Sequence, residues 1–272
     1  MNVNPPLRLP RTVPEKVTVI LTTLGLTVGD ADLRRRIGTF ITCNGYEAVL
    51  EAARETVKVA RRQAKTIADP WPYTIRVYNT NIAHLEHLYI LTHLAETGLR
   101  SQVNQHYIMG VGGDEWHRDP RRYVEPRLIA DFVGKTKELG WGVDRAGNRI
   151  VERPDTPDKF LALISMSQLN QIALRAHAKT PLAILKDPTP KPGARAEIDH
   201  SRIERLLMSA RDARNDVAHN RFVKASVFDE RKTDLLDLLR ILHFDVGKTL
   251  RGIVAQSSPI MAGVIAGLEG AP

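Results

Sequence analysis

The chain has 272 residues, of which 43% are hydrophobic, and 39 lysines and arginines against 31 aspartates and glutamates give a formal net charge of +8. This composition excludes a disordered or fibrous chain and predicts one large globular domain or two small ones. The single Cys43 excludes an intrachain disulfide, and we find neither a signal peptide nor the roughly 20 apolar residues of a spanning helix. We therefore expect a cytoplasmic protein without a membrane segment, whose positive charge favours an acidic partner such as nucleic acid.

The N-terminal part predicts an arm followed by short helices. Residues 1–14 contain four prolines and no periodic apolar pattern, so we expect a disordered arm. Residues 14–25 fit a helix or a strand, and we favour a helix. Asp30 and Asp32 then begin a second helix that ends at Asn44-Gly45. Residues 15–48 are thus predicted to be a small N-terminal helical region.

The rest of the chain predicts further helices joined by long loops. A charged helix over 46–67 is expected to end at Pro70-Trp71-Pro72, before a core helix over 73–107. Further helices are expected at 127–139, 156–172, 198–219 and 229–255, with a loop at 110–126, a hairpin or extended loop at 141–151 and a linker at 180–194. We expect residues 49–255 to form the main domain and 256–272 a tail. The fold class predicted from this pattern is all-α, a helical bundle.

The polar residues most worth explaining lie on the helix predicted at 198–219. Ile203, Leu207, Ala210 and Val217 follow one another at helical steps, and Arg214 falls on the same line, where the pattern favours an apolar side chain. Asn215 and His219 are four residues apart and share the neighbouring face. We expect Arg214, Asn215 and His219 to converge at the edge of a groove between helices.

Such a trio fits phosphodiester transfer in RNA. A guanidinium binds phosphate oxygens through two parallel hydrogen bonds, and an imidazole moves protons at neutral pH. Because the ribose 2′-hydroxyl is the nucleophile, neither a metal nor a cofactor is required. The structural alternative is a buried Arg214 paired with Asp212 or Asp216, and a histidine that simply ends the helix.

Three regions resemble the Abi-like (AbiD/AbiF-type) abortive infection proteins of the HEPN superfamily. The stretch Arg214-Asn215-Asp216-Val217-Ala218-His219 resembles their Arg-Asn-x-x-Ala-His signature. Residues 14–46, with Leu24-Gly25-Leu26 and Asn44-Gly45-Tyr46, resemble their N-terminal pattern. The sequence from Tyr78-Asn79-Thr80-Asn81-Ile82 through Glu96-Thr97-Gly98-Leu99-Arg100 to Trp116 resembles their Glu-x-x-Leu-Arg helix and tryptophan loop.

The resemblance implies a HEPN-like all-α fold, a homodimer whose motifs meet in one cleft, and metal-independent cleavage of RNA in phage defence. Carried over by position, Arg214, Asn215 and His219 would be catalytic, and Glu96 and Arg100 would line or support the cleft. The toxin-like class also allows an antitoxin partner. Family members commonly place His or Glu-Pro after the motif histidine, whereas this chain has Asn220-Arg221-Phe222. A non-catalytic RNA-binding or scaffold protein is therefore the alternative.

Two further sets of residues have functional and plain interpretations. One side of the helix at 46–67 presents basic residues that would follow an RNA backbone or form a solvated face, namely Arg54, Lys58, Arg61, Arg62 and Lys65. The histidines His84, His87 and His93 cannot all face one ion on a helix, so we expect no metal site. A third hypothesis, a DNA-binding autoregulator, lacks an identifiable recognition helix.

Overall fold

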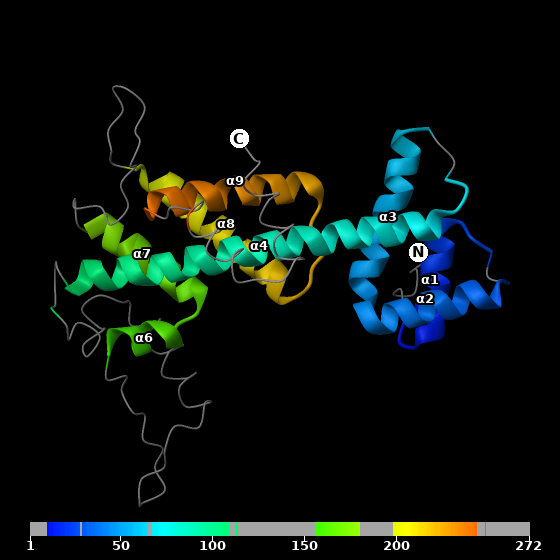
Figure 1. Cartoon of the computed structure of the whole chain (residues 1–272), viewed down its shortest axis with the longest axis horizontal. Helices are drawn as coiled ribbons and strands as arrows, with labels where there is room; N and C mark the ends of the chain where they lie inside the picture. Colours follow the sequence, from blue (N-terminus) through cyan, green and yellow to red (C-terminus); the bar gives the residue numbers. More distant parts are fainter. Residues whose placement is uncertain are drawn as a thin grey trace, which may run out of the picture. The chain divides into compact units, whose positions relative to one another are not determined.

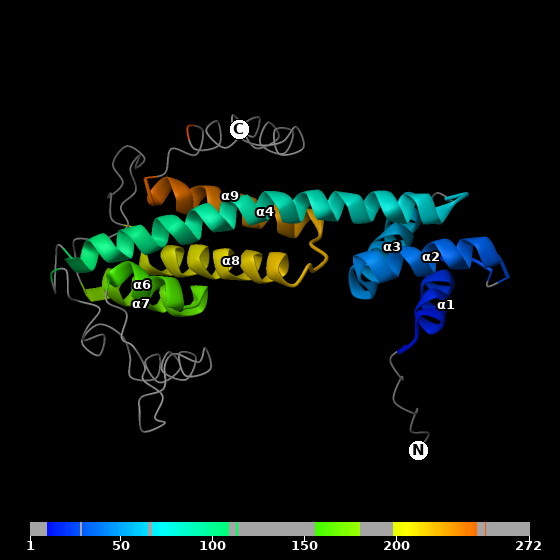
Figure 2. The same ribbon diagram turned by 60° about the horizontal axis from the view of Figure 1, so that its bottom comes forward.

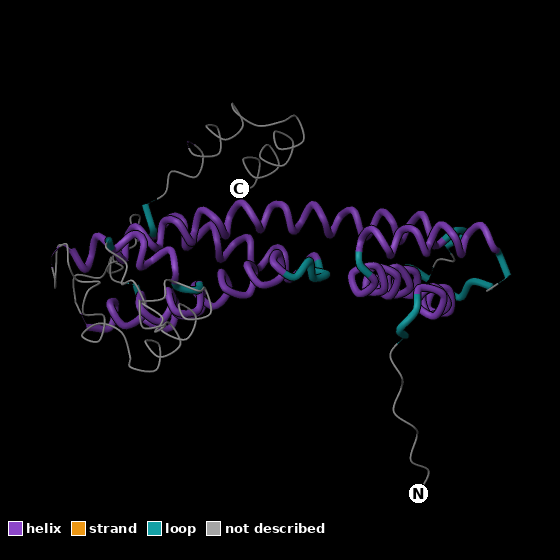
Figure 3. Tube along the Cα trace, turned by 90° about the horizontal axis from the view of Figure 1, so that it is seen from below, coloured by secondary structure: helices purple, strands orange, loops and turns teal. Residues whose placement is uncertain are grey.

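The computed structural model describes residues 10–27, 29–64, 67–108, 113, 156–179, 198–243 and 248. Within this part of the chain every secondary-structure element is a helix and no strand occurs (Figures 1 and 3), which confirms the all-α class. None of the helices described combines the length and the apolar character needed to cross a membrane. The elements predicted at 110–126, 127–139, 141–151 and 180–194, the tail 256–272 and most of the arm lie outside the described residues.

The first compact unit contains Met1–Glu86 and Asp216–Phe228. It is built from α1 (Val13–Leu24), α2 (Ala31–Asn44), α3 (Tyr46–Arg62) and the first half of α4 (Pro70–Tyr107). Helix α1 contacts both α2 and α3, which also contact each other (Figure 1). Their apolar faces form one buried cluster that includes Val17, Ile20, Leu21, Ile37, Ile41, Val49, Ala53, Trp71 and Tyr78.

Local sequence explains where these helices begin and end. Thr12 and Glu15 form a capping box, so α1 begins at Val13, inside the segment predicted as an arm. Gly45 has a φ of 82° and separates α2 from α3, as the Asn44-Gly45 pair predicts. The prediction that Pro70-Trp71-Pro72 precedes the core helix is wrong, because α4 begins at Pro70 and the Asp69 carboxylate accepts the N–H of Trp71 at 3.3 Å. Proline is tolerated in a first turn, where its missing N–H would be unsatisfied anyway.

The second compact unit contains His87–Asn215 and Asp229–Pro272. Its helices are the rest of α4, α6 (Pro157–Leu163), α7 (Met166–Lys179), α8 (His200–Ala218) as far as Asn215, and most of α9 (Ala225–Ile241). Helices α8 and α9 lie alongside α4 (Figures 1 and 2). The apolar stripes of all these helices are buried, including Leu88, Leu91, Leu99, Val103, Leu169, Ile172, Ile203, Leu206, Leu207, Leu235 and Leu239.

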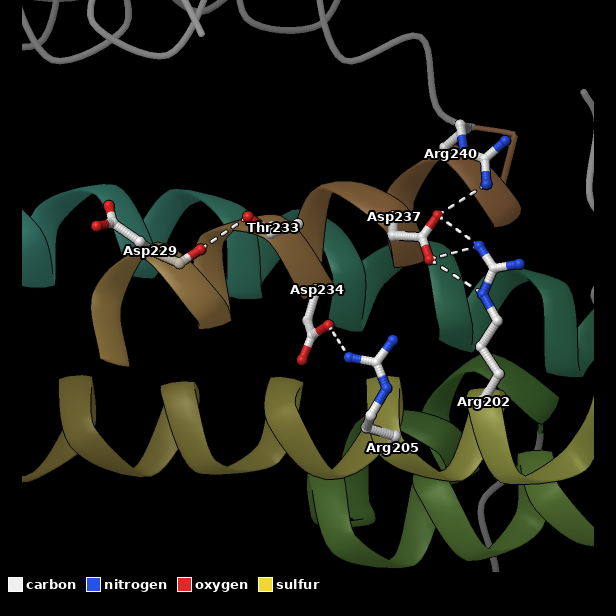
Figure 4. Close-up of polar contacts among 7 residues, drawn as sticks. All are labelled: Arg202, Arg205, Asp229, Thr233, Asp234, Asp237 and Arg240. Atoms are coloured by element: carbon white, nitrogen blue, oxygen red, sulfur yellow. Dashed lines mark hydrogen bonds and ion pairs between the residues drawn. The ribbon is translucent and has the colours of Figure 1, made fainter. Parts of the chain in front are cut away.

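Polar contacts fix α8 against its neighbours within this unit. Arg202 of α8 donates two hydrogen bonds from one nitrogen to Asp237 of α9, at 2.6 and 2.9 Å, and Arg240 donates to the same carboxylate at 2.8 Å (Figure 4). Arg205 pairs with Asp234 one turn away. From α7, the buried amide of Asn170 donates to the carbonyl of Leu207 at 2.6 Å. The helix that holds the signature is therefore held on two sides.

Three boundaries differ from the sequence-based expectation. The helix predicted over 156–172 is two helices, because Ile164 adopts extended backbone with φ −83° and ψ 143°. Helix α9 begins at Ala225 rather than near 229. The predicted boundary at residue 48 falls inside α3, and the compact units divide the chain at Glu86 instead.

Candidate functional site

The last two turns of α8 hold Arg214 and Asn215, and His219 follows the helix directly. Seven residues make nearly two helical turns, so Arg214 continues the line of Leu207, which is 0% exposed. Arg214 is nevertheless exposed, whereas Asn215 is half-buried and His219 is exposed. The arginine thus takes an apolar register position, as the sequence predicts, at the point where that line of side chains emerges into solvent.

The carboxylates on either side of Arg214 are occupied by other arginines. Arg211 holds Asp212 at 3.0 Å, and Arg221 lies 3.9 Å from the carboxylate of Asp216, a residue only 8% exposed. Within the described part of the chain, the side chains of Arg214 and His219 form no hydrogen bond and no ion pair. The alternative of a buried Arg214 paired with Asp212 or Asp216 is therefore wrong, and its guanidinium keeps an uncompensated charge.

A tight turn ends α8 immediately after its signature. The N–H of Asn220 donates to the carbonyl of Val217 at 3.2 Å, and the N–H of Arg221 donates to the carbonyl of Asp216 at 2.9 Å. This pair of bonds is a Schellman motif, with Asn220 in the left-handed conformation at φ 46°. His219 is therefore the C-cap residue of the helix, and Asn220 occupies a position that favours glycine or asparagine.

The helical spacing separates Arg214 from the other two signature residues. Asn215 and His219 are four residues apart and lie about 40° apart around the helix axis, whereas His219 lies about 140° from Arg214. No described contact joins the three side chains, so their convergence stays a prediction. Asn215 and His219 share a face, and Arg214 points to another side of the helix.

Glu96 and Arg100 form contacts within the second unit. They form an ion pair one turn apart on α4, each side chain being less than a quarter exposed. Arg100 also donates to the carbonyl of Ile164 at 3.1 Å, which satisfies the C-terminal end of α6. No hydrogen bond or ion pair described joins this pair to Arg214 or His219. Of their two expected roles, lining the cleft or supporting it, these contacts favour support.

Only part of the basic face of α3 is free to bind an anion. Arg54 pairs with Glu51, and Lys58 lies 3.6 Å from Glu55. Arg61 and Arg62 are exposed, and the described residues offer them no ion pair. Lys65 lies outside the described residues. Arg61 also borders a cavity of about 390 Å³, lined otherwise by Leu24, Thr56, Val57, Ala60, Ala64, Ile67 and Pro70.

The histidines of α4 contact aromatic rings. His84 stacks on Phe228 with 4.1 Å between ring centroids, and His93 lies beside Tyr89 at 6.3 Å. No group of three or more histidine, cysteine, aspartate or glutamate side chains that could hold a metal occurs among the described residues.

Sequence reasoning gave no role to Asn81, which the structure places against the segment that follows His219. Its amide oxygen accepts the N–H of Val223 at 2.6 Å, and its amide nitrogen lies 3.5 Å from the carbonyl oxygen of Arg221. The available signal was a polar residue within the apolar spacing of α4. The side chain is only 1% exposed, and a buried amide of this kind is satisfied by specific partners.

Comparisons with protein-family models, with curated proteins and with solved structures return no match for this chain.

Proposed function

We propose that this protein is a metal-independent endoribonuclease that cleaves RNA through the 2′-hydroxyl, with Arg214, Asn215 and His219 as its catalytic residues. The observation that supports this best is the exposed, uncompensated guanidinium of Arg214 on the helix that ends at the exposed imidazole of His219. The Abi-like resemblance of the signature supports the same assignment. RNA is the substrate, and no cofactor is needed.

Each of these three side chains has its own role in the proposed reaction. Arg214 donates hydrogen bonds to the non-bridging phosphate oxygens and stabilises the negative charge that grows on them. His219 takes the proton of the 2′-hydroxyl while water protonates the departing 5′-oxygen, or His219 protonates the 5′-oxygen while water takes the 2′-proton. The 2′-oxygen bonds to phosphorus as the bond to the 5′-oxygen breaks, which leaves a 2′,3′-cyclic phosphate and a 5′-hydroxyl. Asn215, on the face of His219, holds the ribose or orients the imidazole.

The wide angle between Arg214 and His219 favours a site completed by a second copy. One helix aims the two groups in different directions, so an arginine from one copy and a histidine from another reach a common phosphate more readily. A homodimer of this kind is what the Abi-like resemblance implies, together with a cytoplasmic, toxin-like role in phage defence and an antitoxin partner.

Cleavage of a panel of RNAs in EDTA tests this proposal. We expect cyclic-phosphate ends from the wild type and a loss of about 100-fold or more in Arg214→Ala and His219→Ala. Arg211→Ala is the matched control, because Arg211 is on the same helix but is paired with Asp212. We expect it to retain cleavage within about threefold, since its guanidinium is not free for a phosphate.

A non-catalytic RNA-binding or scaffold protein is the competing function, favoured by Asn220 in place of the residues that commonly follow the family histidine. Salt-dependent binding of RNA by the wild type, with no cleavage of any RNA in the panel, would replace the nuclease by this binder. A His219→Ala protein that cleaves as fast as the wild type would remove His219 from the site.

A further inference from the structure

We propose that Asn81 is a positioning residue that fixes the direction of the His219 imidazole by anchoring the main chain that follows it. This inference rests on the proposed function, because it assigns a reason for holding His219 still. Asn81 lies in the first half of α4, and both Asn81 and the segment Asp216–Phe228 belong to the first compact unit.

The main chain after His219 leaves the helix and depends on partners elsewhere in the unit. Residues 221–224 are irregular, and only the N–H of Arg221 is described as bonded to a carbonyl of α8, so the N–H groups after it need partners elsewhere. The N–H of Val223, which is itself 3% exposed, donates to the Asn81 oxygen at 2.6 Å. The carbonyl oxygen of Arg221 lies 3.5 Å from the Asn81 nitrogen. A single side chain thus meets a donor and an acceptor of one short segment.

The turn between His219 and Val223 is held by its own hydrogen bonds. Asn220 and Arg221 both donate to carbonyls of the last turn of α8, so the chain cannot pivot freely after the helix ends. Arg221 also lies 3.9 Å from the carboxylate of Asp216. Any movement of Val223 is therefore transmitted through a closed turn to His219, four residues earlier.

Apolar contacts also hold the segment that Asn81 binds. Phe222 packs against the apolar cluster of this unit, and His84, on α4 one turn after Asn81, stacks on Phe228 at 4.1 Å. Apolar packing holds the segment against α4 but allows it to slide, because dispersion contacts have little directionality. The Asn81 hydrogen bond fixes the register, since it requires one donor at one distance.

Asparagine suits position 81 better than residues of similar size, such as leucine and aspartate. A leucine of similar size would leave the buried N–H of Val223 without an acceptor. An aspartate would keep the 2.6 Å bond but would have no amide donor toward the carbonyl of Arg221. The two substitutions therefore separate the stronger contact from the weaker one.

Kinetics of three folded variants test the inference. We expect Asn81→Leu to lower kcat about 30-fold or more with KM changed less than threefold, because misplacement of a catalytic group by about 1 Å reduces rates this strongly. Asn81→Asp should retain at least about a third of kcat, since the bond to Val223 survives. Tyr78→Phe is the matched control, because Tyr78 lies on α4 like Asn81 and the change removes its hydrogen bond to the carbonyl of Asn44, the last residue of α2. We expect it to lower thermal stability and leave kcat unchanged.

A readout independent of cleavage separates the failure of this inference from the failure of the proposed nuclease. We expect the ring resonances of His219, followed by NMR on the complete chain, to be single in the wild type and shifted or broadened in Asn81→Leu, with faster amide exchange at Val223. If Asn81→Leu does not fold, Asn81→Ser, whose side chain is too short to reach Val223, replaces it in both measurements. Wild-type kcat together with unchanged His219 resonances in a folded Asn81→Leu or Asn81→Ser variant would overturn the inference. Unchanged RNA in every wild-type reaction would instead refute the nuclease and leave the NMR result to decide the role of Asn81.

Discussion

The main-chain N–H of Arg221 donates to the carbonyl of Asp216 at 2.9 Å and closes α8 around His219. The closure requires a residue at φ 46°, and Asn220 supplies it. Asn220 therefore has a structural role in this turn. The positive φ of Asn220 lets the chain reverse direction after α8, so that Val223 reaches Asn81 on α4.

Substitution of Asn220 tests this reading of the turn. Asn220→Gly should keep the wild-type free energy of unfolding, because glycine adopts a positive φ without steric conflict. Asn220→Val should lower the free energy of unfolding by about 1–2 kcal/mol, because a β-branched residue is strained in the left-handed region. Urea unfolding followed by circular dichroism measures both. Equal stability of the valine and glycine variants would show that the turn does not depend on residue 220.

Arg100 should matter for stability and not for cleavage. Arg100→Ala removes the donor to the carbonyl of Ile164 and leaves Glu96 unpaired, so we expect a loss of about 1–3 kcal/mol in the free energy of unfolding. Cleavage per folded molecule should stay within about twofold at a temperature where the variant is folded, since no described contact links Arg100 to Arg214. A folded Arg100→Ala protein with cleavage reduced tenfold or more would place Arg100 in the RNA site instead.

The basic face of α3 should bind RNA through its unpaired arginines. In a His219→Ala background that prevents cleavage, the double change of Arg61 and Arg62 to alanine should reduce the salt dependence of single-stranded RNA binding by about 1.4 in log–log slope. The matched change of Arg54 and Lys58 should reduce it much less, because Glu51 and Glu55 already neutralise those charges. Fluorescence anisotropy across a series of KCl concentrations provides both slopes. Equal slopes for all three proteins would remove α3 from the RNA path.

The carboxylate of Asp237 should stabilise the folded protein in a pH-dependent way. Burial raises the pKa of its carboxyl, but the hydrogen bonds and charges of Arg202 and Arg240 lower that pKa more strongly, to below the ordinary value of 3.8. The carboxylate therefore stabilises the fold above about pH 4, and this contribution is lost as the pH falls through the lowered pKa. At pH 7, Asp237→Asn should have a free energy of unfolding about 1–2 kcal/mol below that of the wild type, measured by urea unfolding. The difference between the two free energies should be smaller at pH 3.

The exposed Asp32 is the control for this experiment. It pairs with Arg35 and Arg36, but its side chain is 59% exposed, so solvent screens the interaction. Asp32→Asn should leave the urea midpoint unchanged at both pH values. A difference between Asp237→Asn and the wild type that is as large at pH 3 as at pH 7 would contradict the assignment of the effect to the charged pair.

The helices were predictable where local pattern decides them. The apolar spacing around Ile203 and Leu207 predicts a helix over 198–219, and the structure has α8 at His200–Ala218. The Thr12-x-x-Glu15 capping box marks the start of α1 at Val13, so the last two residues of the expected arm are helical. The break at Ile164 has no glycine or proline, but Ser165 and Gln168 bond each other's main-chain N–H groups as a capping box, which begins α7 at Met166.

The candidate site was predictable as a set of residues but not as an arrangement. The Arg-Asn-x-x-Ala-His spacing singled out Arg214 and His219, and helical geometry gave Arg214 its register. The exposure of Arg214 depends on where its neighbours stop covering α8, which sequence periodicity does not contain. The bond from Val223 to Asn81 joins residues 142 positions apart, and only the folded chain brings them together.

The most direct measurement of the central claim is cleavage of one RNA, in EDTA, with and without a single 2′-deoxy nucleotide at its main cleavage position. If Arg214 and His219 act on the 2′-hydroxyl, the all-ribose strand is cut to a 2′,3′-cyclic phosphate and the modified position resists by about 1000-fold or more, because its nucleophile is missing. Cutting of both strands at the same rate would mean that another nucleophile attacks the phosphate, and it would contradict the mechanism proposed for this site.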